Sequence, residues 1–165
     1  MINKIEDFAA AWTMEAELTC KVLDALTDAS LAQRVSEGRR TLGQIAWHLV
    51  TSVHYVTTLG LEFDPPAGGK EAPDSAAFIA AEYRRISAAM LHAVKTQWTD
   101  HTLAETQMVF GEEWSNGGSL HFMMMHQSHH RGQMTVLMRQ AGLRVPYIYG
   151  PAYEDWGEQG LEPRI

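Results

Sequence analysis

The decisive stretch of this chain reads HFMMMHQSHHRGQ over residues 121–133. It contains four of the chain's eight histidines, together with Phe122 and three consecutive methionines. On an α-helix, residues four apart project side by side, so we expect His126 and His130 to be neighbours. This spacing allows two imidazoles to reach one divalent ion at about 2.0–2.1 Å. The stretch therefore predicts a helix that supplies two metal ligands.

The apolar periodicity of this helix indicates which histidines face inward. Its buried stripe comprises Leu120, Met123, Met134, Leu137, Met138 and Ala141. His130 falls near the middle of the stripe and His126 just inside its edge, whereas His129 lies about 120° away. Core or surface histidines with local hydrogen bonds are the alternative to ligands. Burying two imidazoles among methionines without a partner would be costly, which favours the metal.

Four segments have the three- and four-residue apolar periodicity of amphipathic helices. They run from about Asn3 to Leu26, from a Thr41 cap to about Thr58, from Asp74 or Ser75 to about Trp98, and from about Ser119 to Ala141 before Gly142. We therefore predict an all-α fold, a four-helix bundle of the up-down type, forming a single domain over residues 1–165. Bundles build metal sites from side chains on facing helices.

The segments between the expected helices are polar or rich in turn residues. We interpret residues 27–40 and 61–73 as connections. Residues 106–110 have the character of a short extended piece, and residues 111–118 of a turn-rich lead-in to the last helix. The tail contains four aromatic residues that we expect to pack over the end of the bundle: Tyr147, Tyr149, Tyr153 and Trp156.

Composition argues against several function classes. The chain of 165 residues has a net charge of −7 and no cluster of Lys and Arg, whereas nucleic-acid binding needs a basic patch. Cys20 is the only cysteine, so no internal disulfide can form. The charged N-terminus lacks the apolar core of a signal peptide, and no apolar run reaches membrane-spanning length. We expect a soluble, cytoplasmic protein that binds neither nucleic acid nor membrane.

The second expected helix contains two further histidines. His48 lies on one border of its apolar stripe and His54 on the other. Periodicity alone does not decide which of them faces a metal, and both could be simple boundary residues.

Two motifs resemble the DinB/YfiT-like superfamily. Residues 126–133, HQSHHRGQ, are similar to its His-x2-His-His-Arg-Gly-Gln signature, and residues 43–49, GQIAWHL, resemble its second-helix motif. The resemblance implies a bundle in which His48, His126 and His130 bind one divalent ion, and it implies a homodimer. Members of known activity transfer low-molecular-weight thiols such as bacillithiol, or isomerise maleylpyruvate with the help of mycothiol.

The chemistry of such a site follows from its ligands. Three neutral imidazoles leave a fourth position of the ion open to water or substrate, which is the pattern of catalytic sites. All-imidazole ligation suits zinc or nickel first, with iron, copper and manganese as alternatives. An ion of this kind lowers the pKa of a thiol or of water.

Residue 127 is Gln, so the helix lacks the His-Glu-x-x-His arrangement whose glutamate acts as a general base. Glu112 and Glu113 could substitute for it, although loop glutamates are usually solvated charges. Because a thiol on a metal needs no such base, we predict a metal-dependent thiol S-transferase with a small-molecule substrate. A metal-dependent hydrolase and a non-catalytic metal-binding or ligand-binding bundle are the alternatives.

Three features beside the expected ligands have structural interpretations. Arg131 is expected to be the partner of a structural ion pair. Gln133 is expected either to orient a ligand imidazole or to pack. Residues 123–125, three methionines in a row, are expected to lie mostly in the core.

Overall fold

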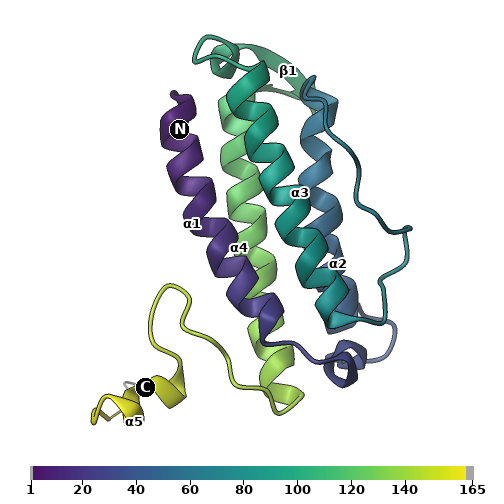
Figure 1. Cartoon of the computed structure of the whole chain (residues 1–165), viewed down its shortest axis with the longest axis vertical. Helices are drawn as coiled ribbons and strands as arrows, with labels where there is room; N and C mark the ends of the chain where they lie inside the picture. The colour runs from purple at the N-terminus through teal and green to yellow at the C-terminus, as the bar shows by residue number, and fades with distance from the viewer. Residues whose placement is uncertain (1, 163–165) are drawn as a thin grey trace.

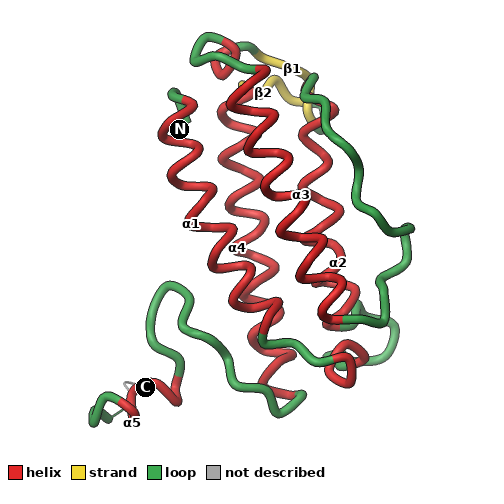
Figure 2. The backbone as a smooth tube through the Cα atoms, viewed as in Figure 1, coloured by secondary structure: helices red, strands yellow, loops and turns green. Residues whose placement is uncertain are grey.

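Four long helices lie side by side in the structure, a computed structural model that describes residues 2–162 (Figure 1). They are α1 (Ile5–Asp24), α2 (Leu42–Val53), α3 (Ala76–Gln97) and α4 (Asn116–Gln140). The shorter elements are the 3-10 turns η1 (Asp28–Ala32), η2 (His54–Leu59) and η3 (Thr102–Ala104), the strands β1 (Thr106–Val109) and β2 (Glu112–Ser115), and the helix α5 (Tyr153–Glu158). The predicted helical fold is confirmed, with a small hairpin at one end (Figure 2).

The directions of the helices differ from a simple up-down order. Gln97 at the end of α3 donates from Nε2 to the Glu62 carbonyl just after η2, at 2.7 Å. The Ala76 amide at the start of α3 donates to Asp28 Oδ1 in η1, also at 2.7 Å, and η1 packs against α2. Helices α2 and α3 therefore run in the same direction, and residues 60–75 return along the outside of the bundle (Figure 1). Amphipathic periodicity identifies a buried face but not a direction.

Each of α1 and α2 packs against both α3 and α4. This arrangement brings α2, with one part of the expected metal site, against α4, with the other part. The core consists of apolar side chains from all four helices, and its large, fully buried members include Phe8, Trp12, Leu49, Tyr83, Ile86 and Met134.

Two helix ends differ from the sequence prediction. Helix α2 ends at Val53 and continues as the 3-10 turn η2, which stops at Gly60 with a φ of 94°. Helix α4 begins at Asn116, three residues before the expected start, with Ser115 Oγ accepting from the Gly118 amide at 3.1 Å. The Asn116 side chain donates to the Thr102 carbonyl at 2.9 Å. Tertiary contacts therefore offset the low helix propensity of the two glycines in this first turn.

The segment before α4 forms an antiparallel hairpin rather than an irregular lead-in. Residues 106–109, expected to be extended, form β1, and its partner β2 lies within the segment expected to be turn-rich. The register pairs Thr106 with Ser115 and Val109 with Glu112. The hairpin lies at the end of the bundle where α4 begins (Figure 2).

The expected ion pair of Arg131 is confirmed. Its guanidinium is 1% exposed and contacts the Glu15 carboxylate of α1. It also donates to Thr19 Oγ1 at 2.8 Å and to the Tyr149 hydroxyl of the tail. Tyr149 in turn donates to Glu15 Oε2 at 2.6 Å. A buried guanidinium needs a charge partner and several hydrogen-bond acceptors. Arg131 finds them on α1 and the tail, so its contacts join α1, α4 and the tail.

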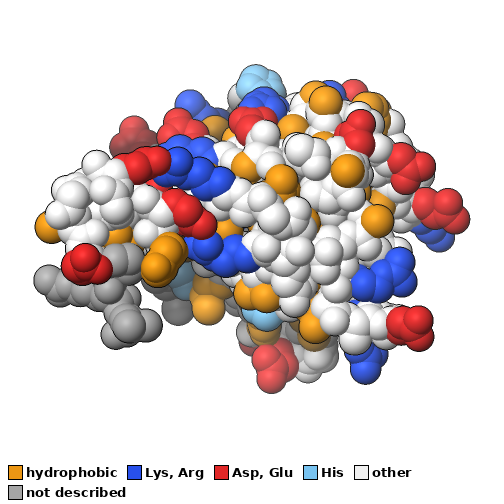
Figure 3. Space-filling model, turned by 90° about the horizontal axis from the view of Figure 1, so that it is seen from below, with side chains coloured by type: hydrophobic (Ala, Val, Ile, Leu, Met, Phe, Trp, Pro, Cys, Tyr) orange, Lys and Arg blue, Asp and Glu red, His pale blue; other side chains and the backbone are white. Residues whose placement is uncertain are grey.

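The tail packs on the bundle less than expected. Tyr149 contacts the Arg131 group, but Tyr147 and Tyr153 are largely exposed and α5 has no buried residue. Ion pairs near the end of α4 hold α5 instead: Arg139 with Glu154, and Arg144 with Asp155 and Glu158. Figure 3 views the molecule from this end and shows cationic and anionic side chains intermixed.

Among residues 2–162, no helix has both the length and the apolar character needed to span a membrane.

Candidate metal centre

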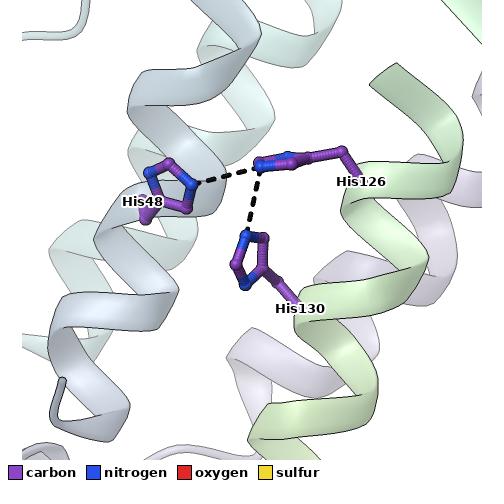
Figure 4. Close-up of side chains that lie close together, drawn as sticks. All are labelled: His48, His126 and His130. Atoms are coloured by element: carbon purple, nitrogen blue, oxygen red, sulfur yellow. Dashed lines mark hydrogen bonds between the residues drawn. The ribbon is translucent and has the colours of Figure 1, made fainter. Parts of the chain in front are cut away.

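Three imidazoles converge where α2 faces α4. His48 comes from α2, and His126 and His130 come from adjacent turns of α4 (Figure 4). The His126 Nε2 atom lies 3.2 Å from His48 Nε2 and 3.1 Å from His130 Nε2. The side-by-side placement of His126 and His130 expected from their spacing is confirmed, and the structure brings His48 to the same point.

These nitrogens have the spacing of ligands to one ion. Each histidine offers a ring nitrogen, and the three nitrogens lie within 4.8 Å of one another. Two ligands of a tetrahedral ion at about 2.0–2.1 Å would be about 3.3–3.4 Å apart, close to the two short distances here. Within residues 2–162, no group forms a hydrogen bond with the buried His126 Nδ1 atom, so no such contact draws the ring away from the cluster. The residues therefore fit a single divalent ion held by imidazoles.

A hydrogen bond orients the His130 ring. Its Nδ1 lies 2.7 Å from Gln133 Oε1, and because an amide oxygen only accepts, Nδ1 is the protonated nitrogen. The Nε2 atom of His130 is then left with a free lone pair directed at the cluster. Gln133 Nε2 is 3.1 Å from His129 Nε2, to which it donates. The role proposed for Gln133 from the sequence, orientation of a ligand imidazole, agrees with these contacts.

The environment keeps the cluster uncharged. Burial lowers the pKa of His48 to about 4, with smaller contributions from His130 and Arg40. Burial also lowers the pKa of His126 to about 4, assisted by His130 and His48. The pKa of His130 is lowered chiefly by burial, and its hydrogen bond to Gln133 opposes that shift. Neutral imidazoles are the form that binds metals.

The two other histidines considered as ligands are not members of this group: His54 lies elsewhere on η2, and His129 packs edge-on against His130 at 4.9 Å between ring centroids. His54 Nε2 is 3.1 Å from the Phe63 carbonyl, and its ring packs edge-on against the Phe63 ring. His129 interacts with Gln133 on the exposed flank of α4. The structure thus places His48, and not His54, beside His126 and His130, which periodicity alone had left open.

The carboxylates considered as general bases are engaged elsewhere. Glu112 Oε2 accepts from Trp114 Nε1 at 3.1 Å, and Glu113 Oε1 accepts from Thr106 Oγ1 at 2.7 Å. Residue 127, the position of the base in a His-Glu-x-x-His helix, is a fully buried Gln whose Nε2 donates to the Leu49 carbonyl at 3.1 Å. Gln127 therefore joins α4 to α2 beside the imidazoles rather than serving in proton transfer.

An open hollow of about 700 Å³ begins at His48. It lies between the N-terminal half of α2 and residues 70–74 of the crossover. Its charged lining residues are Arg34, Arg40, Lys70, Asp28, Glu71 and Asp74. The hollow was not predicted from the sequence. Residues 27–40 and 61–73 were interpreted only as connections, and their composition does not indicate that they meet beside His48.

Trp47 anchors the crossover next to the cluster. Its Nε1 donates to the Gly69 carbonyl at 3.1 Å. A Cβ on Gly68 would lie 2.6 Å from the Trp47 ring, closer than real contacts allow, so the chain can pass here only as glycine. The residue that precedes His48 in the sequence therefore also sets the wall of the hollow.

The depressed pKa values predict a pH-dependent stability for the protein freed of metal. An imidazole with a pKa of about 4 when folded and about 6.5 when unfolded binds more protons in the unfolded state between those values. The free energy of unfolding should therefore fall as pH decreases through this window. Urea titrations with chelator present, between about pH 7.5 and about pH 4.5, measure the effect. His48→Gln should lose less stability on acidification, exposed His92→Gln should match the wild type, and equal curves for all three would contradict the expectation.

Known proteins share both the sequence and the fold of this chain. A sequence model described as the DinB family matches residues 1–163. The chain is 50% identical over 163 residues to the uncharacterized protein YrdA of Bacillus subtilis (strain 168), with 98% of each covered. A crystal structure of a DinB-like protein from Bacillus cereus ATCC 10987 matches with a TM-score of 0.84 at 44% identity, over 90% of this chain and 100% of that one. The DinB-like protein YjoA of Bacillus subtilis shares the fold, with a TM-score of 0.68 at 16% identity over 86% and 96% of the two chains. The chain therefore belongs to the DinB family.

Proposed function

We propose that His48, His126 and His130 bind one divalent metal ion and that the protein uses it to transfer a small thiol to an electrophilic substrate. The observation behind this proposal is the convergence of three neutral imidazole nitrogens within 4.8 Å, a group that includes no carboxylate from the described residues 2–162. A ligand set of this composition leaves a position of the ion open. Zinc and nickel are the ions we expect first.

The reaction forms a bond from the thiol sulfur to a carbon of the substrate. The S–H proton passes to solvent, the S–C bond forms, and the bond from that carbon to its leaving group breaks with the electron pair going to the leaving group. When bound, the ion would supply the Lewis acidity that lowers the pKa of the thiol. Gln133 holds the His130 ring in the tautomer that can ligate, and Gln127 holds α4 against α2.

The contacts of the neighbouring carboxylates favour thiol transfer over hydrolysis. Activation of water in the His-Glu-x-x-His class uses a glutamate beside the ion, and here that position is Gln127, which bonds to the α2 backbone. Glu112 and Glu113 interact within the hairpin. A thiol is acidic enough to ionise without a general base, since its pKa is about 8.5 even when free. The open hollow beside His48 provides room for a small polar molecule.

Removal of a ligand should abolish metal binding. His48→Ala, His126→Ala and His130→Ala are each expected to lose the bound ion, whereas His54→Ala and His129→Ala should retain one ion per chain, because their rings contact Phe63 and Gln133 instead. Gln133→Leu should weaken affinity by about tenfold to about 100-fold, the effect of losing a hydrogen bond to a ligand imidazole. Elemental analysis and chelator competition measure both quantities. Full metal content in His126→Ala or His130→Ala would refute the ligand set.

Activity should require both the ion and a thiol. The protein would be loaded in turn with zinc, nickel, iron, copper and manganese, and assayed with cysteine, glutathione or bacillithiol and 1-chloro-2,4-dinitrobenzene. The rate should rise with pH through an apparent pKa below the ~8.5 of a free thiol and vanish in His48→Ala. Turnover of p-nitrophenyl acetate without any thiol would instead indicate a hydrolase. Tight metal binding without turnover in either assay would favour a non-catalytic binder.

We also propose that two copies of the chain form a homodimer, as the family resemblance implies. Sedimentation equilibrium at micromolar concentration should then give twice the chain mass of 18.5 kDa. A single species at the mass of one chain would contradict this proposal without affecting the metal site, whose three histidines all come from one chain.

A further inference from the structure

A row of aromatic side chains extends from the metal centre to the hairpin. The Phe122 ring lies 6.1 Å from the His126 ring, and the Trp114 ring lies 5.2 Å from Phe122. Phe110 follows at 6.2 Å from Trp114, and Tyr55 lies 6.3 Å from Phe110 with the two rings parallel to within 5°. We call Tyr55, Phe110, Trp114 and Phe122 the aromatic row. All four distances are those of interacting aromatic pairs.

Helical spacing places the row on the same side as the metal ligands. Phe122 precedes His126 by four residues on α4, so the two lie on one face of that helix, and Tyr55 comes from η2, which continues from the end of α2. The hairpin adds Phe110 from its turn and Trp114 from β2. Glu112 Oε2 accepts from Trp114 Nε1 at 3.1 Å and fixes the indole. The row therefore combines α4, η2 and the hairpin.

Phe110 has a backbone conformation that its residue type disfavours. Its φ is 52° and that of Gly111 is 84°, so both central residues of the hairpin turn are left-handed, where Asn-Gly is the preferred pair. The Phe110 side chain is also 77% exposed, so burial does not compensate for the strain. Strained residues of this kind cluster at functional sites. The Phe110 ring lies parallel to the Tyr55 ring, so the side chain of this strained residue forms part of the aromatic row.

We propose that the aromatic row binds a flat, uncharged aromatic group of the substrate whose reacting carbon lies at the three-histidine site. This inference rests on the proposed function and names the class of its electrophile. Phe122, at one end of the row, lies next to His126. A molecule that binds on these rings and extends past Phe122 therefore places that part of itself at the metal ligands. The Glu112 carboxylate at Trp114 disfavours an anionic ring there. The charged hollow lies toward the opposite end of α2, with His48 between the two surfaces, which leaves the hollow for the polar thiol.

A pair of probes with one carbon skeleton tests the aromatic preference directly. Isothermal titration calorimetry would compare 2-naphthalenemethanol with its saturated decahydro analogue on the full chain. Each aromatic pair increases affinity about threefold to about tenfold beyond the effect of burial. The wild type should therefore bind 2-naphthalenemethanol at least about threefold more tightly than its decahydro analogue. Neither alcohol is an electrophile, so the result does not depend on whether thiol transfer occurs.

Phe110→Asn is the decisive variant. It removes the ring and replaces a strained residue by one that tolerates the left-handed conformation, so the hairpin should remain folded and the free energy of unfolding should not fall. We expect its preference for the naphthalene to drop about threefold to about tenfold. Trp114→Leu should reduce the preference in the same way.

Two controls distinguish the row from exposed apolar surface in general. Met108→Ala changes a side chain that is 72% exposed on the same hairpin but pairs with Glu113 rather than Trp114. Phe78→Ala changes a ring as exposed as Phe122, at 38%, that lies against Trp47 beside the hollow. Both should keep the wild-type preference. Equal binding of the two alcohols by the wild type, or an unchanged preference in Phe110→Asn, would overturn the proposal. Dissociation of a dimer by Phe110→Asn with no change in preference would instead make the row a contact between copies, which also overturns it.

Discussion

The close approach of α2 and α4 at three imidazoles is the constraint on which the rest of the site depends. His126 Nε2 lies 3.2 Å from His48 Nε2 and 3.1 Å from His130 Nε2, distances at which either a ring N–H or a shared cation can join two nitrogens. Burial disfavours the imidazolium form of His48 and His126, so these rings are neutral, and neutral imidazoles are the form that binds a metal cation. Gln127 supports the approach by bonding to the Leu49 carbonyl. Gln133 fixes the tautomer of His130, so the lone pair is directed before an ion arrives.

The connections of the bundle determine what surrounds these imidazoles. Because α2 and α3 are parallel, the chain must return along the bundle through residues 60–75, and this crossover forms one wall of the hollow next to His48. The hairpin between α3 and α4 contributes Phe110 and Trp114 to the aromatic row near the other end of α2. The three histidines thus lie between a hollow with charged walls and the aromatic row. A reaction that joins a polar thiol to an apolar electrophile would use both surfaces.

The sequence predicted the features that depend on local periodicity. The four-residue spacing of His126 and His130 was sufficient to pair them, and the four helices lie close to their predicted positions. His48 could be preferred over His54 only through the family motif, because both lie at borders of the same apolar stripe and only tertiary packing distinguishes them. The predicted up-down order does not hold at α3, because apolar periodicity carries no direction. The start of α4 at Asn116 was not predicted, because the Asn116 contacts reach across the fold. Phe110 was also missed, since a positive φ at a phenylalanine leaves no signal in a sequence.

The central claim is a single ion held by three imidazoles with a position left open, and X-ray absorption at the metal edge tests it most directly. For the zinc-loaded protein, the spectrum should contain three imidazole nitrogens at about 2.0–2.1 Å together with a light scatterer. Addition of a thiol should introduce one sulfur at about 2.3 Å while the three imidazoles remain. Fewer than three imidazoles, a protein carboxylate in the first coordination sphere, or a spectrum unchanged by every thiol tested would contradict the account.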